Sequence, residues 1–125
     1  MIVGMGVDIA EVERIKAGIE RYCELFLRRI FTLAERTQCE SFRNKFQRYA
    51  ECFAAKEATM KALGTGWGKG VHWTDIEVVR QKDGSSSIGL YGNARSCADQ
   101  LAVSRIAVSV THTSGEALAE VIFES

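Results

Sequence analysis

Residues 53–66 read FAAKEATMKALGTG, and this stretch decides how the rest of the chain is interpreted. Its pattern continues that of the preceding residues and predicts one long helix over residues 44–63, which ends at Gly64 because glycine commonly follows a helix C-terminus. One face of this helix repeats at steps of four and three residues: Phe46, Ala50, Phe53, Glu57, Met60 and Gly64. Glu57 interrupts an otherwise apolar stripe, and a buried carboxylate requires a cation, a metal ion or a proton.

Two explanations of Glu57 stay open. Lys61 follows it by four residues, in the order that favours an ion pair on the helix surface, so the two residues would form a solvated pair. Alternatively, Glu57 shares a hard cation such as magnesium with Asp8, which is expected to end the strand predicted over residues 2–9. Asp8 has a second interpretation of its own, as the N-cap of the following helix.

The remaining pattern predicts elements in the order β, helices, ββ, α, ββ. The predicted elements are a strand over residues 2–9, a helix from Glu11 whose apolar positions run to Phe26, a helix over 33–42 with Thr32 as its N-cap and Glu35 at the capping-box spacing, the long helix, a hairpin of strands 75–80 and 86–91 around Asp83-Gly84, a helix over 93–102, and strands at 106–110 and 117–123. This order favours an α+β fold in which a mainly antiparallel sheet packs against helices. With 125 residues, the chain is expected to be one domain spanning residues 1–125.

The composition is that of an ordinary globular protein and excludes several classes. The formal net charge is zero, so no charge excess favours nucleic acid or a membrane surface, and no apolar run is long enough to span a bilayer. The N-terminal residues lack the basic leader of a signal peptide. The cysteines form no CxxC pair, which argues against a zinc site. We therefore expect a cytoplasmic protein with free thiols.

Three further features each have a functional and a structural interpretation. The loop GTGWGKG at residues 64–70 offers backbone amides for a phosphate, helped by Thr65 and Lys69, or it is a connector. His112 follows an alternating strand and is a phosphate or ribose contact, a general base, or a histidine bonded to its neighbours. The basic residues of the first helix and of residues 41–61 form a docking surface for an acidic protein or a polyphosphate, or a solvated face.

Several stretches together resemble one family. They are GMGVDIAEVERI near the start, then RRIFTLAE, FAAKEATMKALGTG, DIEV, and SVTHT near the end. In this order, and over nearly the whole chain, they resemble the small bacterial holo-acyl-carrier-protein synthases, which are phosphopantetheinyl transferases. The resemblance implies an α+β homotrimer with coenzyme A lying between neighbouring subunits. It also implies transfer of 4′-phosphopantetheine from coenzyme A to a serine of apo acyl carrier protein, in support of fatty acid biosynthesis.

The resemblance further implies roles for individual residues. Asp8 and Glu57 would bind magnesium, or manganese, together with the pyrophosphate of coenzyme A, and Lys61 would contact phosphate and assist the leaving group. Four residues would hold the nucleotide and its phosphates: Gly64, Thr65, Gly66 and His112. Three arginines expected on the first helix would face the acidic carrier protein: Arg14, Arg21 and Arg28. The general base stays open between Glu57 and a metal-bound water.

One position departs from the family pattern. Many relatives carry an arginine directly before the F-A-x-K-E motif, where it approaches the nucleotide, and this chain has Cys52 there. Arg48 is the residue expected to take over that phosphate contact. Two other classes of function stay open. One is a coenzyme A or carrier-protein binding module without catalysis, and the other is a metal-dependent phosphohydrolase built on the same two carboxylates.

Overall fold

The strands form two antiparallel sheets. The computed structural model describes residues 1–65 and 68–125 of the chain. In the larger sheet, β5 (Glu116–Glu124) lies between β1 (Ile2–Glu11) and β4 (Arg105–His112), and in the smaller one β2 (Ile76–Arg80) pairs with β3 (Ser86–Leu90). The expected α+β class with antiparallel pairing is confirmed, with the strands divided between two sheets.

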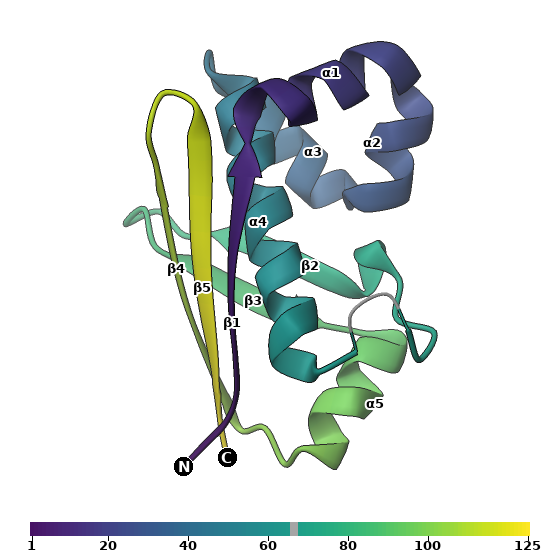
Figure 1. Cartoon of the computed structure of the whole chain (residues 1–125), viewed down its shortest axis with the longest axis vertical. Helices are drawn as coiled ribbons and strands as arrows, with labels where there is room; N and C mark the ends of the chain where they lie inside the picture. Colours follow the sequence, from purple (N-terminus) through teal and green to yellow (C-terminus); the bar gives the residue numbers. More distant parts are fainter. Residues whose placement is uncertain (66–67) are drawn as a thin grey trace.

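The helices gather on one side of the larger sheet (Figure 1). They are α1 (Val12–Tyr22), α2 (Glu24–Ile30), α3 (Leu33–Glu40), α4 (Lys45–Leu63) and α5 (Gly92–Gln100), with a short 3-10 turn at Trp73–Asp75. The long helix is confirmed, and Gly64 ends it in the left-handed conformation at φ 74°. That conformation favours glycine, which has no Cβ to clash with the preceding turn.

Cys23 divides the first predicted helix into α1 and α2. Its φ of 48° lies outside helical geometry. Phe26 therefore leaves the α1 stripe and folds back from α2 over Gly18, where an added Cβ would lie 2.8 Å from the Phe26 ring. The helix predicted to reach Phe42 ends at Glu40. Both predictions were too long, because periodicity carries no signal for a break at which the apolar positions continue.

Helix α4 lies along the inner face of β1 and β5 (Figure 1). Apart from Asp8, the buried inward residues of the two strands are small or apolar: Gly6, Ala10, Ala117, Ala119, Val121 and Phe123. A Cβ built on Gly6 would lie 2.0 Å from the carbonyl oxygen of Ala58 on α4, so the two backbones are nearly in contact. This close approach holds Asp8, two residues further along β1, against the helix.

Gly6→Ala is expected to lower the free energy of unfolding by about 2 kcal/mol or more, because the added carbon would meet helix backbone that cannot rotate away. Chemical denaturation measures the loss. Gly115→Ala is the matched control, since nothing lies within 4 Å of its Cβ position, and it should change stability by less than about 1 kcal/mol. Equal effects of the two substitutions would show that β1 does not approach α4 this closely.

A buried ion pair joins α3, α4 and β2. Lys56 Nζ donates to Glu35 Oε1 at 2.6 Å, and both side chains are fully buried. The same carboxylate accepts the Thr32 amide at 2.8 Å and, through Oε2, the Val78 amide of β2 at 2.7 Å. The predicted capping box at the start of α3 is confirmed, and its glutamate also holds the smaller sheet against the long helix.

Two further expectations concern the state of the cysteines and the presence of membrane-spanning helices. Cys23, Cys39, Cys52 and Cys97 are all free, as expected. Within residues 1–65 and 68–125, no helix combines the length and the apolarity needed to cross a membrane.

Candidate functional site

Asp8 lies inside β1, whereas the sequence placed it at the end of the strand. β1 continues in register with β5 as far as the Glu11–Glu116 pair, and Glu11 is the residue that precedes α1. Asp8 is therefore not the N-cap of that helix. Burial alternates along the strand, so Asp8 shares the inward face with Gly6 and Ala10 and points toward α4.

The partner of Lys61 is Asp8, from the neighbouring strand. Lys61 Nζ donates to Asp8 Oδ1 at 2.9 Å and to the Val7 carbonyl at 3.0 Å. The hydrogen bond and the charge of Asp8 raise the pKa of Lys61 above its ordinary value. The other oxygen, Asp8 Oδ2, is buried and has no hydrogen-bond partner among the described residues. Asp8 Oδ1 is therefore paired with Lys61, whereas the buried Oδ2 is expected to bind a cation or to accept a hydrogen bond.

Glu57 is half-buried beside this pair. Burial raises the pKa of its carboxyl, the negative charge of Asp8 raises it further, and the positive charge of Lys61 lowers it. Glu57 is thus close enough to Asp8 for the two charges to repel one another. The solvated i,i+4 ion pair between Glu57 and Lys61 is not formed, because Lys61 pairs with Asp8 of β1.

The chemistry of this cluster fits a hard divalent cation. It offers two carboxylates, one with an orphan buried oxygen and one with a raised pKa. In the part of the chain that the structure describes, no group of three or more His, Cys, Asp or Glu side chains converges. Magnesium commonly takes only one or two protein carboxylates and completes its shell with water and substrate phosphate. The two-carboxylate set is therefore adequate for such an ion when a phosphate substrate is present.

Glu57 opens on a cavity of about 540 Å³ between α1, α2, α4 and the end of β1. Arg14 of α1 lines the same cavity. Arg21 is exposed at the end of α1, with its guanidinium 5.4 Å from the Tyr22 ring centroid. Arg28 is also exposed but belongs to α2, because the first predicted helix is divided. The three arginines expected to dock a carrier protein thus all lie on the helices beside the Glu57 cavity.

The glycine loop uses its first amides to close α4. The Gly64 amide donates to the Lys61 carbonyl at 3.0 Å, and the Thr65 amide donates to the Met60 carbonyl at 3.3 Å. The phosphate roles of Gly64 and Thr65 stay predictions. Gly66, the third residue expected to bind phosphate here, lies outside the described residues.

Arg48 and His112 meet in a second cavity, which shares no lining residue with the cavity of Glu57. His112 ends β4, and its Nδ1 lies 3.6 Å from Glu51 Oε1. Arg48 Nη1 lies 3.4 Å from the same carboxylate oxygen. Arg48 and His112, two of the residues expected to contact the nucleotide, are therefore brought together, but Glu57 of the carboxylate pair lines a different cavity.

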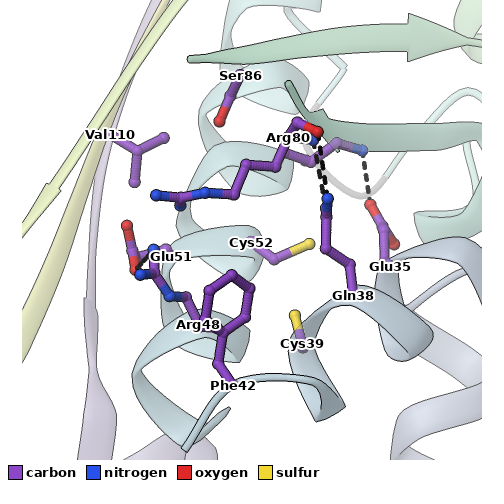
Figure 2. Close-up of a pocket in the computed structure, with 11 residues that line it drawn as sticks. Glu35, Gln38, Cys39, Phe42, Arg48, Glu51, Cys52, Arg80, Ser86 and Val110 are labelled. Carbon is purple, nitrogen blue, oxygen red and sulfur yellow. Dashed lines mark hydrogen bonds and ion pairs between the residues drawn. The ribbon is translucent and has the colours of Figure 1, made fainter. Parts of the chain in front are cut away.

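Cys52 is buried in the wall of an adjoining cavity, and its thiol faces that of Cys39 (Figure 2). Burial raises the pKa of the Cys52 thiol well above its ordinary value, and the hydrogen bond with Cys39 adds to this. The side chain is therefore neutral and cannot replace the arginine that the resemblance implies at this position. Sequence reasoning missed two residues that line this cavity, Phe42 and Arg80, because neither belongs to a motif or to a periodic stripe.

The raised pKa of Glu57 predicts a gain in stability when its charge is removed. The folded state binds a proton at Glu57 more tightly than the unfolded state, so the stability contributed by this group is fully present below the unfolded value of 4.5 and is lost as the pH rises through the folded-state pKa. With a chelator present, Glu57→Gln should therefore raise the melting temperature at about pH 7.5 and change it little at about pH 4. A shift that is the same at both pH values would contradict the buried, repelled carboxylate.

Comparison with known proteins identifies the family. Residues 4–119 match the family model of the 4′-phosphopantetheinyl transferase superfamily. The holo-[acyl-carrier-protein] synthase of Solibacter usitatus is 51% identical over 125 residues, which cover 100% of both chains. The crystal structure of the Neisseria meningitidis holo-[acyl-carrier-protein] synthase matches with a TM-score of 0.88 at 31% identity over 100% of both chains. That of the Helicobacter pylori enzyme in complex with coenzyme A matches with a TM-score of 0.84 at 29% identity, covering 96% of this chain and 99% of that one. The chain therefore belongs to the 4′-phosphopantetheinyl transferase superfamily.

Proposed function

We propose that this chain transfers the 4′-phosphopantetheine group of coenzyme A to a serine of an apo acyl carrier protein and releases adenosine 3′,5′-bisphosphate. This is the activity after which its whole-length relatives are named. The observation that carries the proposal is the cluster of Asp8, Glu57 and Lys61 where β1 meets α4. Transfer of a phosphoryl group asks a protein mainly for positioning and charge neutralisation, and the nucleophile here comes from the partner.

In this proposal Asp8 and Glu57 hold magnesium, with manganese as the alternative. The orphan oxygen of Asp8 and the raised pKa of Glu57 both fit residues that face a cation during turnover. When bound, the ion neutralises negative charge that develops on the pyrophosphate of coenzyme A.

Lys61 supplies positive charge for the leaving group. Its ammonium group has three donors, and two of them are used by Asp8 and Val7. The remaining donor is available to a phosphate oxygen, since 53% of the side chain is exposed. The raised pKa keeps Lys61 protonated. The group that accepts the proton of the incoming serine stays open between Glu57 and a metal-bound water.

The proposal includes a homotrimer with coenzyme A between neighbouring subunits. Two observations support an assembly. The outer face of β1 carries a row of apolar side chains that would stay exposed to water in a monomer: Ile2, Met5, Val7 and Ile9. The carboxylate cluster and the arginine–histidine cavity are also separate within one subunit, as expected if each ligand uses one cavity from either side of an interface.

The remaining partners follow from the same proposal. Arg14, Arg21 and Arg28 would attract an acidic carrier protein and bring its serine to the Glu57 cavity. The reaction would support fatty acid biosynthesis in the cytoplasm. With a net charge of zero, the proposal assigns no partner among nucleic acids and membranes.

Intact-protein mass spectrometry tests the proposal. Apo acyl carrier protein incubated with this chain, coenzyme A and magnesium should gain the mass of one phosphopantetheine, and a chelator should prevent the gain. Coenzyme A binding without any mass gain on several carrier proteins would instead support a binding module. Release of phosphopantetheine into water in the absence of a carrier protein would support a phosphohydrolase.

A further inference from the structure

The second cavity contains a basic side chain that belongs to no predicted site. This cavity, of about 430 Å³, opens between the start of α4, the β2–β3 turn and the end of β4. Its polar lining includes Arg48, Arg80, Ser85, Ser86, Thr111 and His112. Glu51 is the one carboxylate among the described residues that line it. Arginines and hydroxyl groups around a single carboxylate form a lining suited to an anion.

Arg80 enters this cavity from a fixed piece of backbone. Its amide donates to Gln38 Oε1 at 3.3 Å, and its carbonyl accepts from Gln38 Nε2 at 3.2 Å. Its guanidinium lies 5.7 Å from the Phe42 ring centroid and extends toward the side of the cavity where Arg48 and Glu51 lie (Figure 2). Among residues 1–65 and 68–125, no carboxylate forms an ion pair with it. The backbone of Arg80 is therefore fixed by Gln38, and its guanidinium contacts the Phe42 ring but has no counter-ion among the described residues.

Arg48 brings a second guanidinium to the same ring. It lies 4.3 Å from the Phe42 centroid, and its Nε is buried without a partner in the described part of the chain. Glu51 receives Arg48 Nη1 at 3.4 Å and lies 3.6 Å from His112 Nδ1. One carboxylate thus serves two basic residues while Arg80 stays unpaired. An anion in the cavity would neutralise the excess charge and satisfy the orphan donor.

We propose that Arg80 and Arg48 bind a phosphate monoester, and that Arg80 determines the preference for ligands that carry one. A phosphate monoester is a dianion, and its oxygens match the planar donor fork of a guanidinium. The proposal rests on the proposed function for the identity of this group, which is then the ribose 3′-phosphate of coenzyme A. The pyrophosphate of the same molecule belongs to the cluster of Asp8, Glu57 and Lys61.

Cys52 explains why the cation comes from β2. The buried, neutral thiol lines a cavity of about 40 Å³ together with Arg80 and Phe42. A short side chain at position 52 leaves this space open beside the stem of Arg80 (Figure 2). A long cation from α4 would fill the space and repel Arg80. Arg80 therefore supplies from the smaller sheet the charge that α4 lacks at position 52.

Substrate comparison tests the role of Arg80. The transfer assay is run with coenzyme A and with 3′-dephospho-coenzyme A, on the wild type, Arg80→Gln and Arg80→Lys. Arg95→Gln is the control, since Arg95 is an exposed arginine of α5 outside the cavity. Arg80→Gln should lower kcat/KM for coenzyme A about tenfold and change that for the dephospho substrate less than about twofold. Arg80→Lys should retain part of the preference, and the control should retain all of it.

A structural role for Arg80 would lower kcat/KM for both substrates equally, and that result, or no change in either, would overturn the assignment. Calorimetric titration with adenosine 3′,5′-bisphosphate and with 5′-AMP repeats the comparison without turnover. Suppose that Arg80→Gln weakens binding of the bisphosphate but not of 5′-AMP, while the wild type transfers no phosphopantetheine. That pair of results would reject the proposed function and keep the phosphate site. Normal transfer by the wild type, together with bisphosphate binding that Arg80→Gln does not change, would keep the proposed function and reject the phosphate site.

Discussion

Glu57→Gln is expected to lower kcat/KM for phosphopantetheine transfer by about a thousandfold. The substitution keeps the shape of the side chain but removes one of the two carboxylate charges of the cluster, leaving Asp8 as the other. A single neutral amide is a poor ligand for magnesium, and the pyrophosphate would lose most of its charge neutralisation. Steady-state kinetics with coenzyme A and apo carrier protein measure the loss.

The matched control is Glu77→Gln, a glutamate of β2 that lies outside the Glu57 cavity. Like Glu57 it is half-buried, and it should retain activity within about twofold because it lies away from the site. Because Glu57→Gln is also expected to stabilise the fold at neutral pH, unfolding cannot explain its inactivity. An active Glu57→Gln enzyme would remove Glu57 from the metal site.

Glu35→Ala is expected to lower the free energy of unfolding by about 3–5 kcal/mol. The substitution leaves Lys56 fully buried with no carboxylate, and it removes the acceptor of the Val78 amide on β2. A lone buried ammonium group and an unsatisfied amide each carry a desolvation cost that the native network avoids. Denaturant titration of the purified variant gives the change.

The exposed pair of Arg95 and Asp99 provides the comparison, with about two thirds of each side chain exposed, at 66% and 64%. Asp99→Ala should cost less than about 0.5 kcal/mol, since surface pairs at this spacing are weak. Glu35→Leu combined with Lys56→Met should recover part of the loss by removing both buried charges. A cost of Glu35→Ala near that of Asp99→Ala would show that the buried pair does not hold the smaller sheet against the long helix.

Local signals in the sequence predicted the parts of the fold that depend on near neighbours. The long helix, its end at Gly64 and the capping box between Thr32 and Glu35 each rest on residues within a few positions of one another. The β2–β3 hairpin follows from the Asp83-Gly84 turn for the same reason. These elements are confirmed.

The predictions that failed depend on contacts distant in the sequence. Lys61 was weighed as a partner of Glu57 four residues away, but it pairs with Asp8 across 53 positions. Lys56 was grouped with the basic residues of a surface, yet Glu35 of another helix accounts for its burial. Sequence spacing suggests partners that are close along the chain. The packing of β1 and α3 on α4 instead brings in partners that are distant along the chain but adjacent in space.

The candidate site was predictable as a set of residues but not as an arrangement. The resemblance named Asp8, Glu57 and His112, and Arg48 was expected to replace the arginine missing at position 52. In the structure Glu57 lines one cavity, whereas Arg48 and His112 line another. Arg80 had no signal at all, because a lone arginine at a strand end resembles any surface cation. Only its position beside Phe42, without a counter-ion among the described residues, distinguishes it.

In the proposed reaction, Asp8 and Glu57 together hold the divalent cation on which transfer depends. The most direct test is a crystal of this chain grown with coenzyme A and manganese, in which anomalous scattering locates the ion. We expect a manganese peak liganded by Asp8 Oδ2 and a Glu57 carboxylate oxygen, next to the pyrophosphate of coenzyme A. Coenzyme A bound with manganese away from either carboxylate would contradict it.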